Sequence, residues 1–254
     1  MKLNSTLVLL SLLLPSISWA GSCQGEKNGL IASYELDTFS YSESTETGTD
    51  STTPTHSAFF NFIRKNNNLV SYQYPQMGIS KSWFRTKNQR VNSVHYFDKF
   101  NRAIEYDNAD LPKGSNDNWD GMYPMISKTF LNTMDSKAAT DDCEITFKHK
   151  KGGQSWDIVW SESLNLPIEM THISKHKKTI LKLKYFKNDM QAVVARLEAL
   201  SAYQSTDYAD IGDNESDPFL RKMIRLGFVK HEASGFYDAQ GNAQKQDGHA
   251  AHTH

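Results

Sequence analysis

Regular alternation of apolar and polar side chains recurs along this chain and limits the folds open to it. In residues 68–75 (NLVSYQYP), Val70 and Tyr72 are separated by one polar residue, which is the period of a half-buried β-strand. Such runs are separated by turn residues such as Gly152-Gly153, which favour tight hairpins. We expect strands at residues 30–36, 56–65, 68–75, 79–86, 90–107 (two strands around a turn at 98–101), 143–150, 155–160, 165–172 and 179–186.

Three segments have the period of a helix instead. Apolar residues recur every four positions in residues 122–134, and residues 190–200 carry one continuous apolar stripe. Residues 218–226 predict a third helix with separate apolar and polar faces. Many strands and few helices predict an α+β fold, with a large curved antiparallel β-sheet (half-barrel-like) and a few helices packed on one side.

The first twenty residues have the properties of a secretory signal peptide. The basic Lys2 precedes an apolar run at residues 7–14, which is too short to span a bilayer. Small residues at Ser18 and Ala20 then favour cleavage after residue 20. We divide the chain into a signal peptide (1–20), a single α+β domain (21–230) and a polar, disordered tail that contains histidines (231–254).

The mature chain is therefore expected in the periplasm, which is an oxidising compartment. Its two cysteines are Cys23 and Cys143, and an even number in a secreted chain favours one disulfide between them. Cys23 also follows small residues, as the cysteine of a lipoprotein signal does. Since Ala20 stands where such signals place Leu, lipidation at Cys23 is kept only as the alternative.

Charge and hydropathy argue against nucleic-acid binding and against a transmembrane segment. The 28 Lys and Arg residues include Lys2, so the mature chain has 27 basic residues against 29 acidic ones. No net positive field is present to attract nucleic acid. No later stretch approaches the ~18 apolar residues of a membrane span, so we expect no transmembrane segment. The oligomeric state is left open.

An acidic cluster at residues 207–217 is the first candidate site. Ser216 or Asp217 can cap a helix that begins at Pro218, which accounts for the end of the cluster. Three acids are not needed for capping: Asp207, Asp210 and Asp213. Their carboxylates could bind calcium or another divalent cation. Because their spacing differs from that of a calcium-binding loop, a hydrogen-bonded structural loop is the competing interpretation.

The C-terminal tail is the second candidate metal site. His249, His252 and His254 could bind Zn, Cu or Ni through their imidazole nitrogens. The surrounding residues are polar and small, so no core holds them in place. An unstructured chelator loses conformational entropy on binding, and the alternative is a terminus that meets metals only adventitiously.

No familiar enzyme motif is present. The chain lacks the nucleophile elbow G-x-S-x-G, the zinc motif H-E-x-x-H and a phosphate-binding P-loop. His95 lies within an expected strand, where a buried or cross-strand histidine is the ordinary interpretation. We therefore expect a protein that is not an enzyme, and an enzyme whose groups converge only in the fold is the alternative.

Aromatic residues occupy both odd and even positions of the expected strands, so they point to both faces of the sheet. A sheet with apolar residues on both faces must be covered on both, or must expose one face to a ligand. A hydrophobic cavity for a lipid, an acyl chain or an apolar peptide is the hypothesis that follows. The ligand-facing candidates are Phe60, Phe62, Tyr72, Trp83, Trp156 and Trp160.

The strand pattern WDIVW…NLPIEM…TILKLKYF follows a meander and one helix. In this it resembles the C-terminal half of periplasmic lipoprotein-carrier proteins and their relatives. The likeness covers residues 30–187, rests on pattern and carries over no functional residue. It implies a curved half-barrel sheet that is covered by helices and encloses an apolar cavity.

Together these features predict a secreted envelope protein that is not an enzyme. It would bind or carry an apolar ligand (a lipid, an acyl chain or a lipoprotein) on its aromatic sheet. The helices at 190–200 and 218–226 would form a lid over that ligand. The alternative is an envelope metal-binding protein, which would hold a divalent cation with its C-terminal histidines or with the acidic loop at 207–217.

Overall fold

The structure is a computed structural model of the 254-residue chain. The described residues are 28–40, 53–112, 114–115, 118–138, 143–211, 216–226, 233–237 and 243–245. The predicted signal peptide at 1–20 lies outside them, as does the part of the acidic cluster at 212–215.

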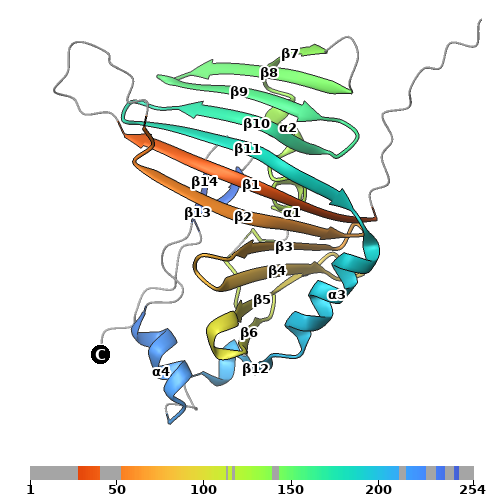
Figure 1. Cartoon of the computed structure of the whole chain (residues 1–254), viewed down its shortest axis with the longest axis vertical. Coiled ribbons are helices and arrows are strands. Elements are labelled where there is room, and N and C mark those ends of the chain that lie inside the picture. Colours follow the sequence, from red (N-terminus) through yellow and green to blue (C-terminus); the bar gives the residue numbers. More distant parts are fainter. Residues whose placement is uncertain are drawn as a thin grey trace, which may run out of the picture.

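In this part of the chain, twelve strands form one curved, open sheet, antiparallel except where β12 pairs with β6 (Figure 1). From edge to edge the strands are β12 (Gln204–Asp207), β6 (Arg102–Tyr106), β5 (Val91–Phe97), β4 (Ile79–Arg85), β3 (Leu69–Tyr74), β2 (His56–Lys65), β1 (Gly29–Ser40), β11 (Lys177–Asn188), β10 (Leu166–Ile173), β9 (Gln154–Ser161), β8 (Glu144–Lys151) and β7 (Asp135–Ala138). Within the predicted tail, β13 (Ala233–Tyr237) pairs with β14 (Ala243–Lys245).

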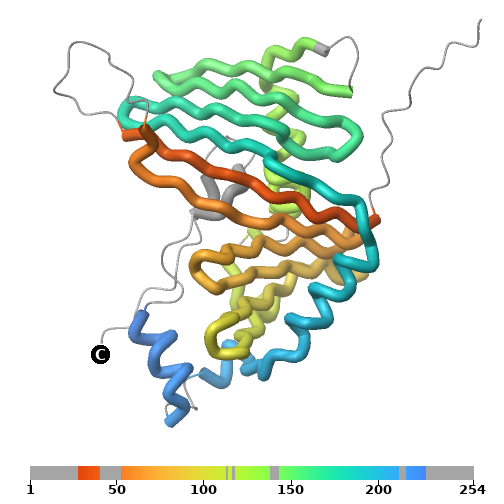
Figure 2. The backbone as a smooth tube through the Cα atoms, viewed as in Figure 1, coloured from red at the N-terminus to blue at the C-terminus, as the bar shows by residue number. Residues whose placement is uncertain are grey.

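The chain builds the sheet outward from β1 in two halves. Strands β1 to β6 form a meander, and the chain then crosses to the other edge and returns through β7 to β11 (Figure 2). The two halves meet in the middle, where Leu36 of β1 lies opposite Ala58 of β2 on one side and Leu181 of β11 on the other. A continuous sheet therefore depends on a pairing between strands that are far apart in sequence.

Strand register sorts the side chains onto two faces. We call the face that carries most of the hydrophobic core the aromatic face. Its buried residues include Tyr34, Phe60, Phe62, Tyr72, Trp83, Trp156, Ile158, Trp160, Met170 and Leu181. We call the opposite side of β3 and β4 the serine face. It buries the small or polar side chains of Ser71, Gln73, Ser80 and Ser82.

The helices divide between these two faces. The short helices α1 (Trp119–Met122) and α2 (Lys128–Leu131) lie behind the sheet in Figure 1, on the aromatic face. The helix α4 (Pro218–Arg225) reaches the same face, where the ring of Phe219 lies 5.3 Å from that of Phe97. In contrast, α3 (Met190–Ser201) packs on the other side, where Leu200 contacts Tyr96 and Ala103.

The predicted α+β fold class with a large, curved and open antiparallel sheet is confirmed. The position of α3 differs from the arrangement that we expected, because it lies on the side of the sheet opposite to α1, α2 and α4. None of the described helices is both long enough and apolar enough to cross a bilayer.

The continuous helix expected at 122–134 is wrong. Pro124 has no backbone N–H to extend α1, and Met125 adopts a left-handed φ of 71° that ends the helical path. The second turn, α2, then starts afresh at Ser127, whose hydroxyl accepts a hydrogen bond from the backbone N–H of Thr129. The result is an irregular segment with two helical turns.

Candidate functional site

The six predicted ligand-facing aromatic residues all lie on the aromatic face, and none is more than 6% exposed. Four of them stack across neighbouring strands. The ring of Tyr72 lies 5.9 Å from Phe60, 5.0 Å from Phe62 and 5.8 Å from Trp83. Edge-to-face and offset contacts of this kind stabilise aromatic clusters beyond simple burial. The sequence hypothesis thus identified a real aromatic layer, while a bound ligand stays a prediction.

Trp156 and Trp160 lie on β9, in the other half of the sheet. Trp156 stacks on His172 at a ring distance of 4.6 Å and meets Phe130 of α2 edge-on at 5.5 Å. Its indole Nε1 is buried and has no hydrogen-bond partner among the described residues. The aromatic candidates therefore form two groups within one core, linked by the segment that covers them.

Residues 118–134, which we call the cover, lie over the aromatic face. The residues that they contribute to the hydrophobic core are Trp119, Met122, Met125, Ile126, Phe130, Leu131 and Met134. Three of these are methionines, whose unbranched side chains adapt to irregular surroundings. Helix α3, which the sequence placed in the lid, is absent from this face. The cover is therefore a loop-like segment, and it was not recognised from the sequence.

A buried arginine fastens the cover to the sheet. Arg64 of β2 is 1% exposed and shares the aromatic face with Phe62. Its Nη1 donates to the backbone carbonyls of Tyr123, at 3.5 Å, and Asn165, at 3.2 Å, and its Nη2 donates to the carbonyl of Leu164. The guanidinium also lies 4.8 Å from the centre of the Tyr123 ring.

No carboxylate among the described residues pairs with Arg64. Burial lowers the pKa of Arg64 below its ordinary value, although nearby tyrosine hydroxyls act in the opposite direction. A buried charge stabilised only by carbonyls and aromatic rings is unusual. The sequence did carry a signal for it, because Arg64 continues the inward-facing series of Phe60 and Phe62 in HSAFFNFIRK.

Tyrosine hydroxyls add further hydrogen bonds on this face. The hydroxyl of Tyr72 donates to the carbonyl of Met122 in the cover at 3.1 Å. The hydroxyl of Tyr123 donates to the carbonyl of Asn66 in the β2–β3 turn at 2.6 Å. Burial raises the pKa of Tyr72 well above its ordinary value, so its hydroxyl stays protonated as a donor. These bonds run from side chains to backbone carbonyls.

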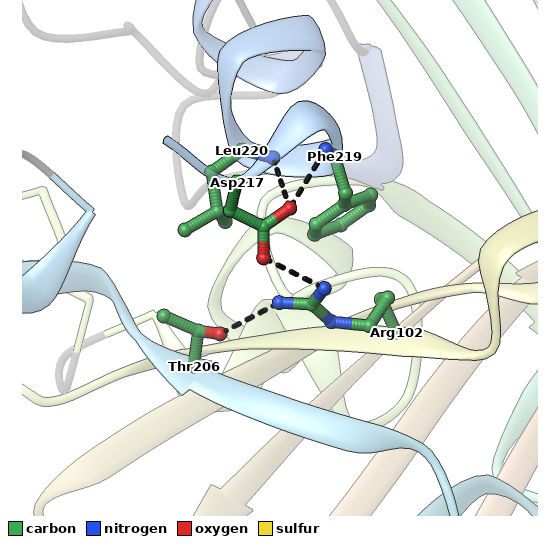
Figure 3. Close-up of polar contacts among 5 residues, drawn as sticks. All are labelled: Arg102, Thr206, Asp217, Phe219 and Leu220. Atoms are coloured by element: carbon green, nitrogen blue, oxygen red, sulfur yellow. Dashed lines mark hydrogen bonds and ion pairs between the residues drawn. The ribbon is translucent and has the colours of Figure 1, made fainter. Parts of the chain in front are cut away.

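The end of the acidic cluster has the structural role that was expected for it (Figure 3). Asp217 is the N-cap of α4, and its Oδ1 accepts from the backbone N–H groups of Phe219 at 2.8 Å and Leu220 at 3.4 Å. Its Oδ2 accepts from Arg102 Nη1 at 2.8 Å. Burial opposes ionisation, but the bond from Arg102 and the two backbone donors hold the pKa of Asp217 below its ordinary value.

The predicted metal ligands are only partly described. Asp207 ends β12 and Asp210 ends the short 3₁₀ helix at Tyr208–Asp210. Asp213 and the tail histidines His249, His252 and His254 lie outside the described residues. Within the described ranges, no group of three or more His, Cys, Asp or Glu residues could hold a metal ion. Binding of a divalent cation by the acidic loop or the tail stays a prediction.

The predicted disulfide joins a described residue to one that is not described. Cys143 directly precedes β8 and is half-buried, with a left-handed φ of 54°. Cys23 lies outside the described residues. The disulfide between Cys23 and Cys143 stays a prediction, and the part of the chain that the structure describes contains no free cysteine.

A wide groove lies on the outer half of the sheet, on the side away from the aromatic face. Its volume is about 560 Å³. Val159, Thr171 and Ile173 line it together with charged side chains that include Lys148 and Asp157, which form a salt bridge at 2.8 Å. This mixture of charged and aliphatic residues is typical of a solvated sheet face, and it differs from the apolar cavity that the sequence hypothesis requires.

No protein-family model and no curated protein matches the sequence. Among solved structures, PNGF-II in its P21 crystal form aligns over 73% of this chain with a TM-score of 0.34 and 9% identity, and the C2 form aligns with a TM-score of 0.31. The aligned part spans about a third, 32%, of the PNGF-II chain.

A third structure, from Vibrio parahaemolyticus, is described as an outer membrane lipoprotein-sorting protein domain. It aligns over 70% of this chain and 94% of its own length, with a TM-score of 0.31 and 7% identity. Its printed description names the same kind of protein that the strand pattern of this chain resembles. Similarity this distant carries no argument about function.

Proposed function

We propose that this protein is a non-enzymatic carrier of an apolar ligand, a lipid, an acyl chain or a lipoprotein, in the bacterial envelope. The ligand would lie between the aromatic face and the cover at residues 118–134. The observation that carries the proposal is the way Arg64 fastens this cover. Its guanidinium binds backbone carbonyls of the cover and of the neighbouring turn, above a layer of stacked aromatic rings.

In this proposal the cover separates from the sheet to admit the ligand. It contributes no strand to the sheet next to the aromatic rings, and it is held there by its buried apolar side chains and by hydrogen bonds that include those from Arg64 and Tyr72. Breaking those bonds leaves every strand pairing of the sheet intact. When the cover opens, water can replace its carbonyls as hydrogen-bond partners of Arg64. The free-energy cost is therefore smaller than that of leaving the guanidinium without partners in an apolar environment.

The lining suits an apolar ligand. Aromatic rings and flexible methionines can repack around an acyl chain or the lipid part of a lipoprotein without forming specific polar contacts. The predicted signal peptide would deliver the chain to the periplasm, where such ligands must cross water between two membranes. Localisation and ligand are both parts of the proposal.

Native mass spectrometry of protein purified from bacterial periplasm gives the first test. We expect a mass excess that corresponds to bound lipid and that disappears after organic extraction. The second test is a titration with the fluorescent fatty acid 11-(dansylamino)undecanoic acid, which should bind saturably and be displaced by palmitate.

A pair of variants places the ligand. Replacing Met122 in the cover by Asp should weaken dansyl-fatty-acid binding, because a carboxylate would then lie beside the acyl chain. The matched control is Met77→Asp, since Met77 is 48% exposed and lies in a turn outside the core. Absence of co-purifying lipid together with absence of saturable binding by the unaltered protein would contradict the proposal.

A further inference from the structure

A polar cavity lies on the opposite side of the sheet, between α3 and strands β1 to β4. Its volume is about 330 Å³, which is at the lower end of the range for small-molecule sites, roughly 300–1,000 Å³. Its polar and charged lining residues are Asn61, Gln73, Ser80, Asp98 and Arg196, and its aliphatic lining includes Ile31 and Ile63. This cavity shares no lining residue with the cover.

Two buried polar side chains at this cavity each have a donor atom that lacks a hydrogen-bond partner. Gln73 is 5% exposed and Ser80 is fully buried. Gln73 Nε2 and Ser80 Oγ have no partner among the described residues. Buried amide and hydroxyl groups are nearly always hydrogen-bonded in folded proteins. A ligand that accepts hydrogen bonds from both groups would explain why they are retained at the wall of a cavity.

The cavity also contains one positive and one negative side chain. Arg196 donates its Nε–H to Gln73 Oε1 at 3.2 Å, and no described residue accepts from its two Nη groups. Asp98 Oδ1 accepts from the hydroxyl of Tyr203 at 3.0 Å. No salt bridge joins Arg196 to Asp98 in the described part of the chain. Each charge is thus available to a separate group on a bound molecule.

Charge complementarity limits the chemistry of that molecule. A simple anion would pair with Arg196 but would be repelled by Asp98. A simple cation would pair with Asp98 but would be repelled by Arg196. A molecule with an anionic group at one end and an ammonium group at the other satisfies both side chains. Its anionic oxygens could also accept from Gln73 Nε2 and Ser80 Oγ, as carboxylates and phosphates do at clustered donors.

We infer that this cavity binds a small zwitterion, with its carboxylate or phosphate at Arg196, Gln73 and Ser80 and its ammonium at Asp98. Ile31 and Ile63 provide apolar wall for the atoms between the two charges. Two sources share this chemistry, a free amino acid and a phosphoethanolamine headgroup. The site is independent of the proposed carrier function, because it lies on the other face of the sheet.

Isothermal titration calorimetry on the purified full chain tests the inference with three probes: L-leucine, O-phosphoethanolamine and inorganic phosphate. We expect at least one of the two zwitterions to bind with one equivalent per chain. Arg196→Gln and Asp98→Asn should each weaken it about tenfold or more, since each removes one half-buried charge partner. Asn at 98 can still accept from Tyr203, so the local hydrogen bond is preserved.

The matched control is Arg221→Gln, which removes a positive charge from the exposed side of α4. It should leave binding unchanged. Binding of L-leucine alone identifies a free amino acid as the source, and binding of O-phosphoethanolamine alone identifies the headgroup. The inference is overturned if neither zwitterion binds, if both site variants bind as well as the control, or if phosphate binds as tightly as the zwitterion that binds.

Discussion

The two faces of the sheet are made by the same strands but are covered in different ways. On the aromatic face, large side chains such as Tyr72 and Trp83 lie beneath an irregular cover with two short helical turns. On the serine face, Ser71 and Ser82 lie on the side where the regular helix α3 packs, and their hydroxyls are 2.9 Å apart. Neighbouring positions on β3 therefore face environments of opposite character.

Side-chain size explains much of this difference. Small residues let a helix approach the sheet closely, and the start of α3 shows how close that approach is. A Cβ added to Gly29 of β1 would lie 2.7 Å from the Cα of Met190, which is too short for a real contact. Large aromatic side chains keep the opposite cover further away, so the backbone carbonyl of Tyr123 in the cover is within reach of the long Arg64 side chain.

The largest contrast between the faces should come from paired truncations. Phe62→Ala removes a fully buried ring from the aromatic face and should lower the free energy of unfolding by about 3–5 kcal/mol. Ser82→Ala removes one hydroxyl from the serine face and should cost about 1 kcal/mol. Urea denaturation followed by tryptophan fluorescence measures both. Equal losses would show that the two faces do not differ as described.

Arg64→Met removes the fastening of the cover and keeps most of the side-chain volume. The buried carbonyls of Leu164 and Asn165 then lose their donor, so we expect a loss of about 2–3 kcal/mol in urea denaturation. Hydrogen exchange should also accelerate in residues 118–134. The control is Arg90→Met, at an exposed position. If Arg64→Met exchanges like this control, Arg64 does not fasten the cover.

Acid should destabilise the aromatic face through His95. This histidine is buried with both ring nitrogens unpaired among the described residues, and burial, helped by the charge of Lys81, lowers its pKa well below 6.5. Below about pH 6.5 the unfolded chain therefore binds a proton that the folded chain excludes, and stability falls by up to about 1.4 kcal/mol per pH unit.

Above that pH the contribution of His95 is constant. The test compares the pH dependence of unfolding for the unaltered protein and for His95→Gln, which removes the titrating group. His172, whose pKa is also lowered by burial, titrates in both proteins and cancels in the difference. Identical pH profiles for the two proteins would contradict the assignment to His95.

A smaller effect is expected where α4 joins the aromatic face. Asp217→Ala removes the N-cap of α4 and the partner of Arg102, and should cost about 1 kcal/mol in urea denaturation. Glu198→Ala, at an exposed position of α3, is the control and should have little effect. A loss no larger than that of the control would show that the cap contributes nothing measurable.

The smallest effect on the sheet is expected from the C-terminal tail. A chain truncated after Gln246 lacks His249, His252 and His254. Its sheet should be as stable as that of the full chain. If the tail binds metal, calorimetry with Zn²⁺ should show that binding is lost on truncation. Equal Zn²⁺ binding by both chains would remove the tail as a metal site.

Much of the fold was predictable because each strand carries its own periodic signal. The turn at Gly152-Gly153 was correct, since both residues adopt the positive φ that glycine allows. The cap at Asp217 was also correct. Local patterns of this kind depend only on residues that are close in sequence, so they can be recognised without knowing the fold.

The remainder depends on pairings that no local pattern contains. The β1–β11 pairing joins the two sheet halves, and β12 is a four-residue strand added in parallel to β6. The cover was mistaken for one helix because its apolar spacing is helical while Pro124 and Met125 interrupt it. The polar cavity brings together residues of four strands and α3, so only the folded chain reveals it.

Hydrogen exchange measured with and without palmitate is the most direct test of ligand binding beneath the cover. Binding between the cover and the aromatic face should change exchange in residues 118–134 and in β2 to β4. It should leave α3, which packs on the other side of the sheet, unchanged. A change confined to α3, or no change at all, would contradict an apolar ligand site on the aromatic face.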